Sequence, residues 1–552
     1  MKHRFALVAV LIIALSSLAG GLMGNSSVDQ TAHGDFYSTL TEVLEVVQRD
    51  YVRSVGTDHL IYSAIKGMLR SLDPHSGFYD PKEFARLKEE QRSRYCGVGA
   101  AVRPLTGEGG RVVVVEPPAA GSPAARHGMR AGDVITHIEG VPIDSLSFDE
   151  VVNRRLRGLP GTWVNLTVER PGVFNPLHFR IERDEIPIVT VPYAFEIRPG
   201  VGYIKIDHFS ESTAIELKKK LADLNAGALS GLILDLRNNL GGLLSQAIDV
   251  ADLFLARGKL VVSTRGRTQA SARFYRAPSG EKSRVPLVVL MNRQSASASE
   301  VVAGALQDHD RALIVGETSF GKGLVQSVYS LGNNTGMALT TARYYTPSGR
   351  LIQRDYSGSS TEYYFGSRKA GDGKPHDIKQ TDSGRKVLGG GGITPDVVEP
   401  TLEPNRFQAV VISKRVFFEY SRRLTSGQVP AGHEFKLPLP VEESGVRIEK
   451  DPKSLPRPEI TTAVLEDFRE FLRSRRIDFT ENDIKENTSF IERHIKQEVY
   501  TYFFGRQEGF KIAVSADNQL NKALEVLPQA RLLMSTGRIG PRVGLPGADR
   551  FR

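Results

Sequence analysis

The spacing of apolar residues predicts helices near the start of the chain. Between residues 36 and 69, apolar side chains recur three or four positions apart, which is the period of one helix face. Pro74 interrupts this pattern, because a proline restrains the backbone of the residue before it. We therefore predict an N-terminal helical region over residues 36–92.

Short β-like runs separated by Gly and Pro follow, and they predict a second unit over residues 95–184. From 186 to 400, mostly apolar runs such as 231–236 alternate with helical stretches such as 243–255. A mostly apolar run is typical of a strand buried on both faces, and the alternation favours βαβ crossovers on a largely parallel sheet. Within this part, the Gly/Ser-rich segment 355–392 predicts a loop.

The end of the chain is again helical. A Pro-rich linker begins near residue 403, and the helical stretches after it predict a C-terminal helical extension over 403–534. Its pattern suits packing or oligomerisation better than a second enzyme. The sequence of residues 535–552 predicts a disordered basic tail.

The pattern of the N-terminal residues predicts a targeting signal. Lys2 and Arg4 precede an uncharged apolar stretch, 5–24, which is long enough to span a bilayer. Basic residues before such a span favour a cytoplasmic N-terminus and an exported body, in the periplasm or cell envelope. Segment 1–24 is either a signal peptide, removed after the small residues 17–19, or a retained transmembrane anchor in the inner membrane.

The composition excludes several classes of protein. The chain has 552 residues, and 72 Lys and Arg against 63 Asp and Glu give a net charge of +9. More than half of this excess lies at the two chain ends, so no nucleic-acid-binding surface is expected. A single cysteine, Cys96, excludes an intrachain disulfide and a multi-cysteine zinc site. We expect no metal and no cofactor.

The densest candidate chemistry is the segment Asn-Arg-Gln-Ser-Ala-Ser-Ala-Ser-Glu at 292–300, between a predicted strand and a predicted helix. A serine at such a turn lies at the carboxyl edge of the sheet, where α/β folds bind ligands. The amide next to it lies at a helix N-terminus, where it can stabilise an oxyanion. Ser297 and Glu300 also match a capping box, which needs no catalysis. The segment alone leaves both interpretations open.

A serine nucleophile needs a base, and Lys322 is the candidate. Residues 316–322 begin like a phosphate-binding loop, but Gly323 replaces the magnesium-binding Ser or Thr and a strand pattern follows. Nucleotide binding is therefore not expected, and the lysine is solvated, paired or catalytic. His309 is a poorer base, because it lies roughly 18 Å from Ser297 along the predicted helix. His75 fits better as a structural residue of a turn.

Several segments of the chain resemble the motifs of the C-terminal processing peptidases, also called tail-specific proteases, and they occur in the same order. The similar segments span about two thirds of the chain and lie at 72–76, 96–100, 122–133, 235–242, 295–300, 316–326, 339–350 and 381–385. The resemblance implies an α/β protease core of the ClpP/crotonase-like type at 186–400. It also implies a PDZ domain at 95–184, inserted between the helical region and the core.

The resemblance also assigns the site residues. It implies Ser297 as the nucleophile, Lys322 as the base and Gln326 as the residue that orients the base. The oxyanion would be bound by the amides of Ala298 and of one glycine of the pair Gly241 and Gly242. Leu240 stands where the family usually has proline. The PDZ loop that would bind the carboxylate of a substrate consists of Cys96, Gly97, Val98 and Gly99.

We therefore expect an exported serine endopeptidase that acts on protein or peptide substrates with free C-termini. Burial must make Lys322 neutral before it can accept the proton of Ser297, because an ordinary lysine is protonated at neutral pH. The PDZ domain would select the substrate and gate the site. A PDZ adaptor that binds tails without cutting them, and an acyl-CoA-processing enzyme on a similar core, are the alternatives. Self-association and an adaptor protein partner stay open.

Overall fold

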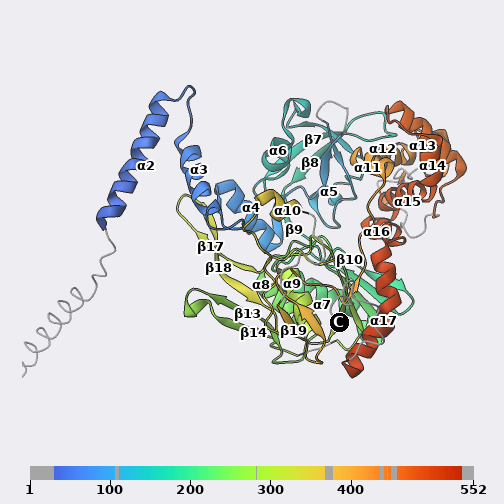
Figure 1. Cartoon of the computed structure of the whole chain (residues 1–552). Coiled ribbons are helices and arrows are strands. Elements are labelled where there is room, and N and C mark those ends of the chain that lie inside the picture. The colour runs from blue at the N-terminus through green and yellow to red at the C-terminus, as the bar shows by residue number, and fades with distance from the viewer. Residues whose placement is uncertain are drawn as a thin grey trace, which may run out of the picture. The chain divides into compact units, whose positions relative to one another are not determined.

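The structure is a computed structural model, and it describes residues 30–105, 111–280, 283–366, 377–435, 441–443, 446–448 and 457–537 (Figure 1). The predicted targeting segment and residues 538–552 of the predicted tail lie outside the described residues. The predicted start of the tail was wrong, since residues 535 and 536 belong to a helix. No described helix is long and apolar enough to cross a membrane. The contacts divide the chain into two units, Met1–Asp80 with Tyr329–Ala338, and Pro81–Val328 with Leu339–Arg552.

The first unit contains two helices and a short strand pairing. The helices are α2 (Gln30–Asp50) and α3 (Thr57–Arg70). Strand β1 (Gly77–Tyr79) pairs antiparallel with the first residues of β18 (Gly336–Tyr345). Between α3 and β1, a carboxylate oxygen of Asp73 accepts hydrogen bonds from the amides of His75 and Ser76 over 2.8 Å each. His75 thus lies in a turn held by a side chain, which agrees with the structural interpretation of this residue.

The second unit begins with α4 (Pro81–Arg92) and continues into the part predicted as a PDZ domain. Its sheet has the order β3-β4-β5-β7-β8, with β6 on β5, and all pairings are antiparallel. The strands are β3 (Val102–Pro104), β4 (Val112–Val114), β5 (Val134–Ile138), β6 (Val141–Pro142), β7 (Trp163–Glu169) and β8 (Leu177–Glu182). The helical turns are α5 (Pro123–Arg126), α6 (Phe148–Glu150) and Val151–Leu156. Strand β3 lies at the edge of this sheet, and β2 (Arg94–Gly97) pairs with β9 (Asp184–Pro187) apart from it.

A six-stranded sheet of order β10-β11-β12-β15-β16-β21 forms the centre of the following part. Its strands are β10 (Tyr193–Arg198), β11 (Val201–Lys205), β12 (Gly231–Asp235), β15 (Leu287–Met291), β16 (Ala312–Gly316) and β21 (Val397–Val398). All neighbours from β11 to β21 run parallel, as the alternating pattern predicts, and β10 is antiparallel to β11. One face packs against α7 (Thr213–Asp223), α8 (Leu244–Asp252) and α9 (Ala298–Asp308).

Smaller elements flank this sheet. Strand β13 (Leu260–Gly266) pairs with β14 (Arg273–Arg276) and with the last residues of β18, and β17 (Leu324–Ser330) pairs with β18. The predicted loop at 355–392 was partly wrong, since it contains α10 (Ser360–Phe365), β19 (Ile378–Gln380) and β20 (Lys386–Leu388). The hydroxyl of Ser359 caps α10 by accepting from the amide of Glu362, and the ring of Tyr363 packs edge-on against Phe320. The polar composition did not reveal this tertiary contact.

The end of the described chain is helical. Its helices are α11 (Arg406–Ser413), α12 (Val416–Thr425), α13 (Thr462–Ser474), α14 (Glu481–Glu486), α15 (Thr488–Phe504), α16 (Arg506–Val514) and α17 (Asn518–Thr536), and β22 (Val441–Glu443) pairs with β23 (Val446–Ile448). Helices α11 to α15 share a core of their own, with Phe417 stacked on Phe468. Helices α16 and α17 instead cover the second face of the parallel sheet (Figure 1). On this face the rings of Phe510 and Tyr193 stack with their centroids 3.8 Å apart.

Candidate active site

Ser297 occupies the turn between β15 and α9. Its φ of 55° and ψ of −113° lie in a region that residues with a side chain rarely adopt, and the residue is 8% exposed. The amide of Ala298 is the first of the helix, so it lies where the helix dipole favours a negative charge. A strained strand-to-helix turn of this kind presents a serine hydroxyl at the carboxyl edge of a sheet.

Buried Glu300 joins this turn to the loop that carries Lys322. Its Oε2 atom accepts hydrogen bonds from the amide of Ser297 over 2.8 Å and from the amide of Lys322 over 2.9 Å. Its Oε1 atom accepts from the amide of Gly321 over 2.6 Å. Burial raises the pKa of the Glu300 carboxyl, although these hydrogen bonds oppose the rise. The capping interpretation therefore describes only one of these three contacts, and one side chain fixes two backbone segments together.

The loop around half-buried Lys322 is held from a second direction. The amide of Gly323 donates to Oε1 of buried Gln353 over 2.7 Å, and the amide of Arg354 donates to the carbonyl of Gly321 over 3.0 Å. The backbone on both sides of the lysine is thus fixed by four hydrogen bonds from α9 and from residues 353–354. Sequence reasoning missed Gln353, because no motif marks it.

Gln326 lies on β17, the strand into which the lysine loop leads. Its side-chain amide donates to the hydroxyl of Thr340 on β18 over 3.4 Å. The structure thus joins the turn of Ser297 to the loop of Lys322 through Glu300, and it places Gln326 four residues beyond the lysine, against the neighbouring strand.

Gly241 packs directly against the serine turn. A Cβ atom on this residue would lie 2.8 Å from Cβ of Ser297 and 2.9 Å from the amide nitrogen of Ala298. The amide of Gly241 donates to the side-chain carbonyl of Asn239 over 2.9 Å, whereas the amide of Gly242 has no hydrogen-bond acceptor among the described residues. Within the predicted pair, Gly242 is therefore the one whose amide is open to a ligand.

His309 is engaged away from the serine. It follows α9 at the end opposite Ser297, and its two ring nitrogens lie 2.9 Å from the Asp382 carboxylate and 2.7 Å from the carbonyl of Leu260. A ring with both nitrogens bonded here cannot serve Ser297. Among the described residues, no group of three His, Cys, Asp or Glu side chains is arranged to hold a metal ion.

Comparisons with known proteins decide the family. The model described as Peptidase family S41 matches residues 200–358, and the PDZ domain model matches 114–170. The carboxy-terminal-processing protease of Bartonella bacilliformis is 41% identical over 352 residues, which cover 63% of this chain and 78% of that protein. The chain belongs to peptidase family S41. It is a carboxy-terminal processing protease, a serine peptidase, as the order of its motifs predicted.

A second relative agrees with this assignment. The carboxy-terminal processing protease CtpA of Bacillus subtilis is 34% identical over 355 residues, which cover 63% of this chain and 74% of that protein. A solved structure, the photosystem II D1 C-terminal processing protease, is 34% identical and covers 57% of this chain and 89% of its own, with a TM-score of 0.32. The S41 match ends at residue 358 and the PDZ match at residue 170, so helices α11 to α17 lie outside both.

The predicted carboxylate-binding loop of this S41 peptidase divides into two parts. Cys96 and Gly97 belong to β2, and an isolated bridge joins Gly97 to Arg157. Val98 and Gly99 follow the strand, ahead of the edge strand β3. Gly99 has a φ of 80°, and a Cβ atom there would lie 2.6 Å from Cβ of Ser122. Glycine is thus required at this position for both its conformation and its size.

Two of the segments that resemble family motifs bind the C-terminal end of α9, the helix that begins after Ser297. Fully buried Arg350 forms an ion pair with Asp308 in the last turn of α9. Arg385 forms ion pairs with Asp310 over 2.6 Å and with Asp396 over 2.5 Å. These arginines fix the C-terminal end of α9, while Glu300 fixes its N-terminal end.

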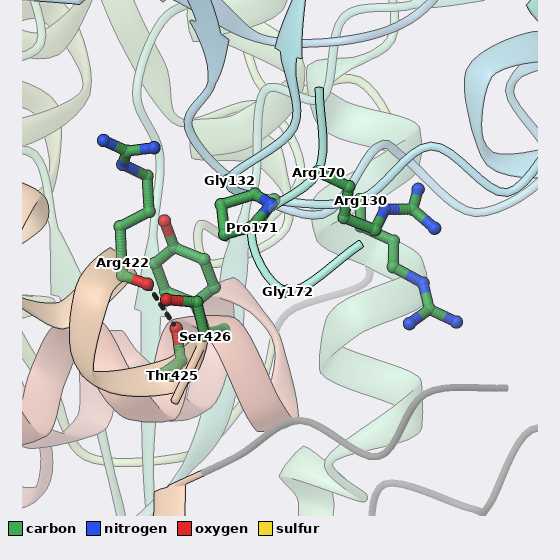
Figure 2. Close-up of a pocket in the computed structure, with 10 residues that line it drawn as sticks. Arg130, Gly132, Arg170, Pro171, Gly172, Arg422, Thr425 and Ser426 are labelled. Carbon is green, nitrogen blue, oxygen red and sulfur yellow. Dashed lines mark hydrogen bonds between the residues drawn. The ribbon is translucent and has the colours of Figure 1, made fainter. Parts of the chain in front are cut away.

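A small cavity of about 50 Å³ lies between the PDZ domain and the C-terminal helices. It is lined among others by Arg130 and Arg170 of the PDZ domain and by Arg422 of α12. Figure 2 shows that the guanidinium groups of Arg130 and Arg170 are directed away from that of Arg422, so they do not converge on one anion. Arg170 is bound by buried Asp133 over 2.7 and 2.8 Å. The cavity contains none of the predicted site residues.

Proposed function

We propose that this protein is an exported endopeptidase that cleaves the C-terminal tails of protein substrates through an acyl-enzyme on Ser297, with Lys322 as the base. The observation that carries the proposal is the carboxylate of Glu300, which bonds the amides of both residues. A nucleophile and a base react together only when they are held close to each other in a fixed geometry. A buried carboxylate that binds the backbone of both residues supplies that restraint.

The reaction begins with Lys322 in its neutral form. As Oγ of Ser297 forms a bond to the scissile carbonyl carbon, the lysine takes the hydroxyl proton. The amides of Ala298 and Gly242 donate to the resulting oxyanion. The carbon–nitrogen bond then breaks, and the same proton passes to the leaving amine. Water, activated by the lysine, hydrolyses the acyl-enzyme. Gln326 has no basic group, and its role is to orient the lysine.

The PDZ domain would select the substrate. A tail would add to the sheet as a strand beside β3, the edge strand, and its carboxylate would reach the loop of Val98 and Gly99. The family of this chain supports a core of the ClpP/crotonase-like type around the parallel sheet. Export, with the segment 1–24 either cleaved or retained as an anchor, and association with a second copy or an adaptor protein are parts of the same proposal.

The test compares a peptide that ends in a free apolar carboxylate with its C-terminal amide. Wild-type protein should cleave the free acid with the lower KM, and Ser297→Ala and Lys322→Ala should lose about 10⁴-fold or more in kcat. Lys322→Arg keeps the positive charge and should be equally inactive, because a guanidinium does not deprotonate. Binding of the tail without cleavage by the wild type would favour the adaptor alternative, and cleavage by Lys322→Ala would refute the dyad.

A further inference from the structure

Helix α17, the last described helix, contacts the loop that carries Gly241 and Gly242, although it lies outside both family matches. Arg237, two residues after β12, donates from Nη1 to both oxygens of Asp517, over 2.9 and 2.7 Å. Asp517 also caps α17, because its carboxylate accepts from the amide of Leu520 over 2.8 Å. One carboxylate therefore begins a helix and binds a residue of the loop.

The remaining donors of Arg237 bind the end of the central strand. Nε lies 3.0 Å from one oxygen of Asp235, and Nη2 lies 2.7 Å from the other. Burial alone would raise the pKa of Asp235, but the guanidinium of Arg237 holds this pKa well below its usual range. Nη1 has a further acceptor, the side-chain carbonyl of Gln519 over 2.9 Å. The side chain is 12% exposed, so these partners determine its position.

The backbone that follows Arg237 leads directly to the serine turn. Two residues later, the carbonyl of Asn239 accepts from the amide of Ala296 over 2.9 Å and from the hydroxyl of Ser299 over 3.0 Å. The side chain of Asn239 also accepts from the amide of Gly241. A shift of Arg237 would therefore move the glycine pair relative to Ser297.

We propose that Asp517 is a positioning residue for the peptidase reaction. It holds Arg237, and through it the backbone of residues 237–242, so that the amide of Gly242 stays aimed at the developing oxyanion. This inference rests on the proposed function. Donors to an oxyanion act in the transition state and not on the bound substrate, so loss of Asp517 lowers kcat and leaves KM unchanged. The C-terminal helices are then part of the active enzyme.

The test uses the full chain with Asp517→Ser and Asp517→Asn. Serine and asparagine both cap a helix well, but serine is too short to reach Arg237. Asp517→Ser should lower kcat by about 2- to 30-fold, the range of indirect coupling, and Asp517→Asn by less. Asp517→Glu should restore most of the rate. Glu525→Gln is the matched control, because it removes the exposed 2.6 Å ion pair with Lys522 on the same helix.

The outcomes separate the two proposals. An unchanged kcat in Asp517→Ser overturns the inference, and so does a raised KM at unchanged kcat, because the helix would then act on substrate binding. A loss of rate that follows the melting temperature and disappears on cooling shows a structural role only, which also overturns it. No cleavage by the wild type, or cleavage by Ser297→Ala, counts instead against the proposed function.

Discussion

The carboxylate of Glu300 lies 2.9 Å from the backbone amide of Lys322, 22 residues further along the chain. The same oxygen also accepts from the amide of Ser297, three residues before it. A side chain that caps a helix is thus also the link between the candidate nucleophile and the candidate base. The geometry of the candidate dyad depends on a residue that takes no part in the proton transfer.

Glu300→Gln tests this link with an isosteric change. The amide group of glutamine would present a donor to backbone donors, so at least one of the hydrogen bonds to Ser297, Gly321 and Lys322 is lost. We expect kcat to fall about 10²-fold through misplacement and the free energy of unfolding to fall by about 1–3 kcal/mol. Peptide cleavage and urea unfolding measure the two effects. An unchanged kcat would show that the link does not position the dyad.

Gly241→Ala tests the contact between the glycine pair and the serine turn. The new Cβ atom would lie 2.8 Å from Cβ of Ser297, and the φ of 99° is itself strained for alanine. We expect kcat/KM to fall by about 10²- to 10³-fold, as when one oxyanion donor is lost. Gly258→Ala is the matched control, because its φ of 82° carries the same strain with nothing within 4 Å. Equal losses of kcat/KM in both variants would show that backbone strain alone causes the effect.

Gly99→Ala tests the carboxylate-binding loop of the PDZ domain. The added methyl group would collide with Ser122 and displace the loop, so KM for a peptide with a free C-terminus should rise at least about tenfold, or ~1.4 kcal/mol. Cleavage of a short peptide with an amidated terminus should stay unchanged. Gly140→Ala, with a φ of 76° and open space around it, is the control within the same domain. An equal rise in KM in both variants would argue against capture of the substrate carboxylate by this loop.

Glu498 on α15 should make the stability depend on pH. Burial raises the pKa of this carboxyl to about 7, although nearby Arg103 opposes the rise. Between pH 5 and 7 the unfolded chain therefore releases this proton while the folded protein keeps it, so stability falls as the pH rises. Between pH 5 and 8 this group should lower the free energy of unfolding of the wild type by roughly 1–3 kcal/mol, and Glu498→Gln should not show this decrease.

Urea unfolding of the wild type and of Glu498→Gln at several pH values measures the difference. Glu492→Gln on the same helix controls for the loss of one carboxylate from α15. A wild-type profile that runs parallel to that of Glu498→Gln would show that this group does not titrate in the window.

Much of the architecture followed from local pattern. The alternation of apolar runs and helical stretches predicted a largely parallel sheet, and the strand of 231–236 and the turn at Ser297 lie where the sequence placed them. The period of apolar residues, the helix caps and the turns depend on residues a few positions apart, so they can be predicted from the local sequence. The family, too, was evident from the order of the motifs.

The contacts between distant segments were decided only by the tertiary structure. Tyr363 of α10 packs on Phe320, and α17 covers a sheet face that its own sequence pattern does not specify. Arg237 meets Asp517 from 280 positions away. Such pairs depend on which strands lie side by side and which faces are covered, and a long-range contact leaves no periodic signal in either partner. The sequence by itself thus determined the family and the candidate nucleophile and base, while only the folded chain decided what holds them in place.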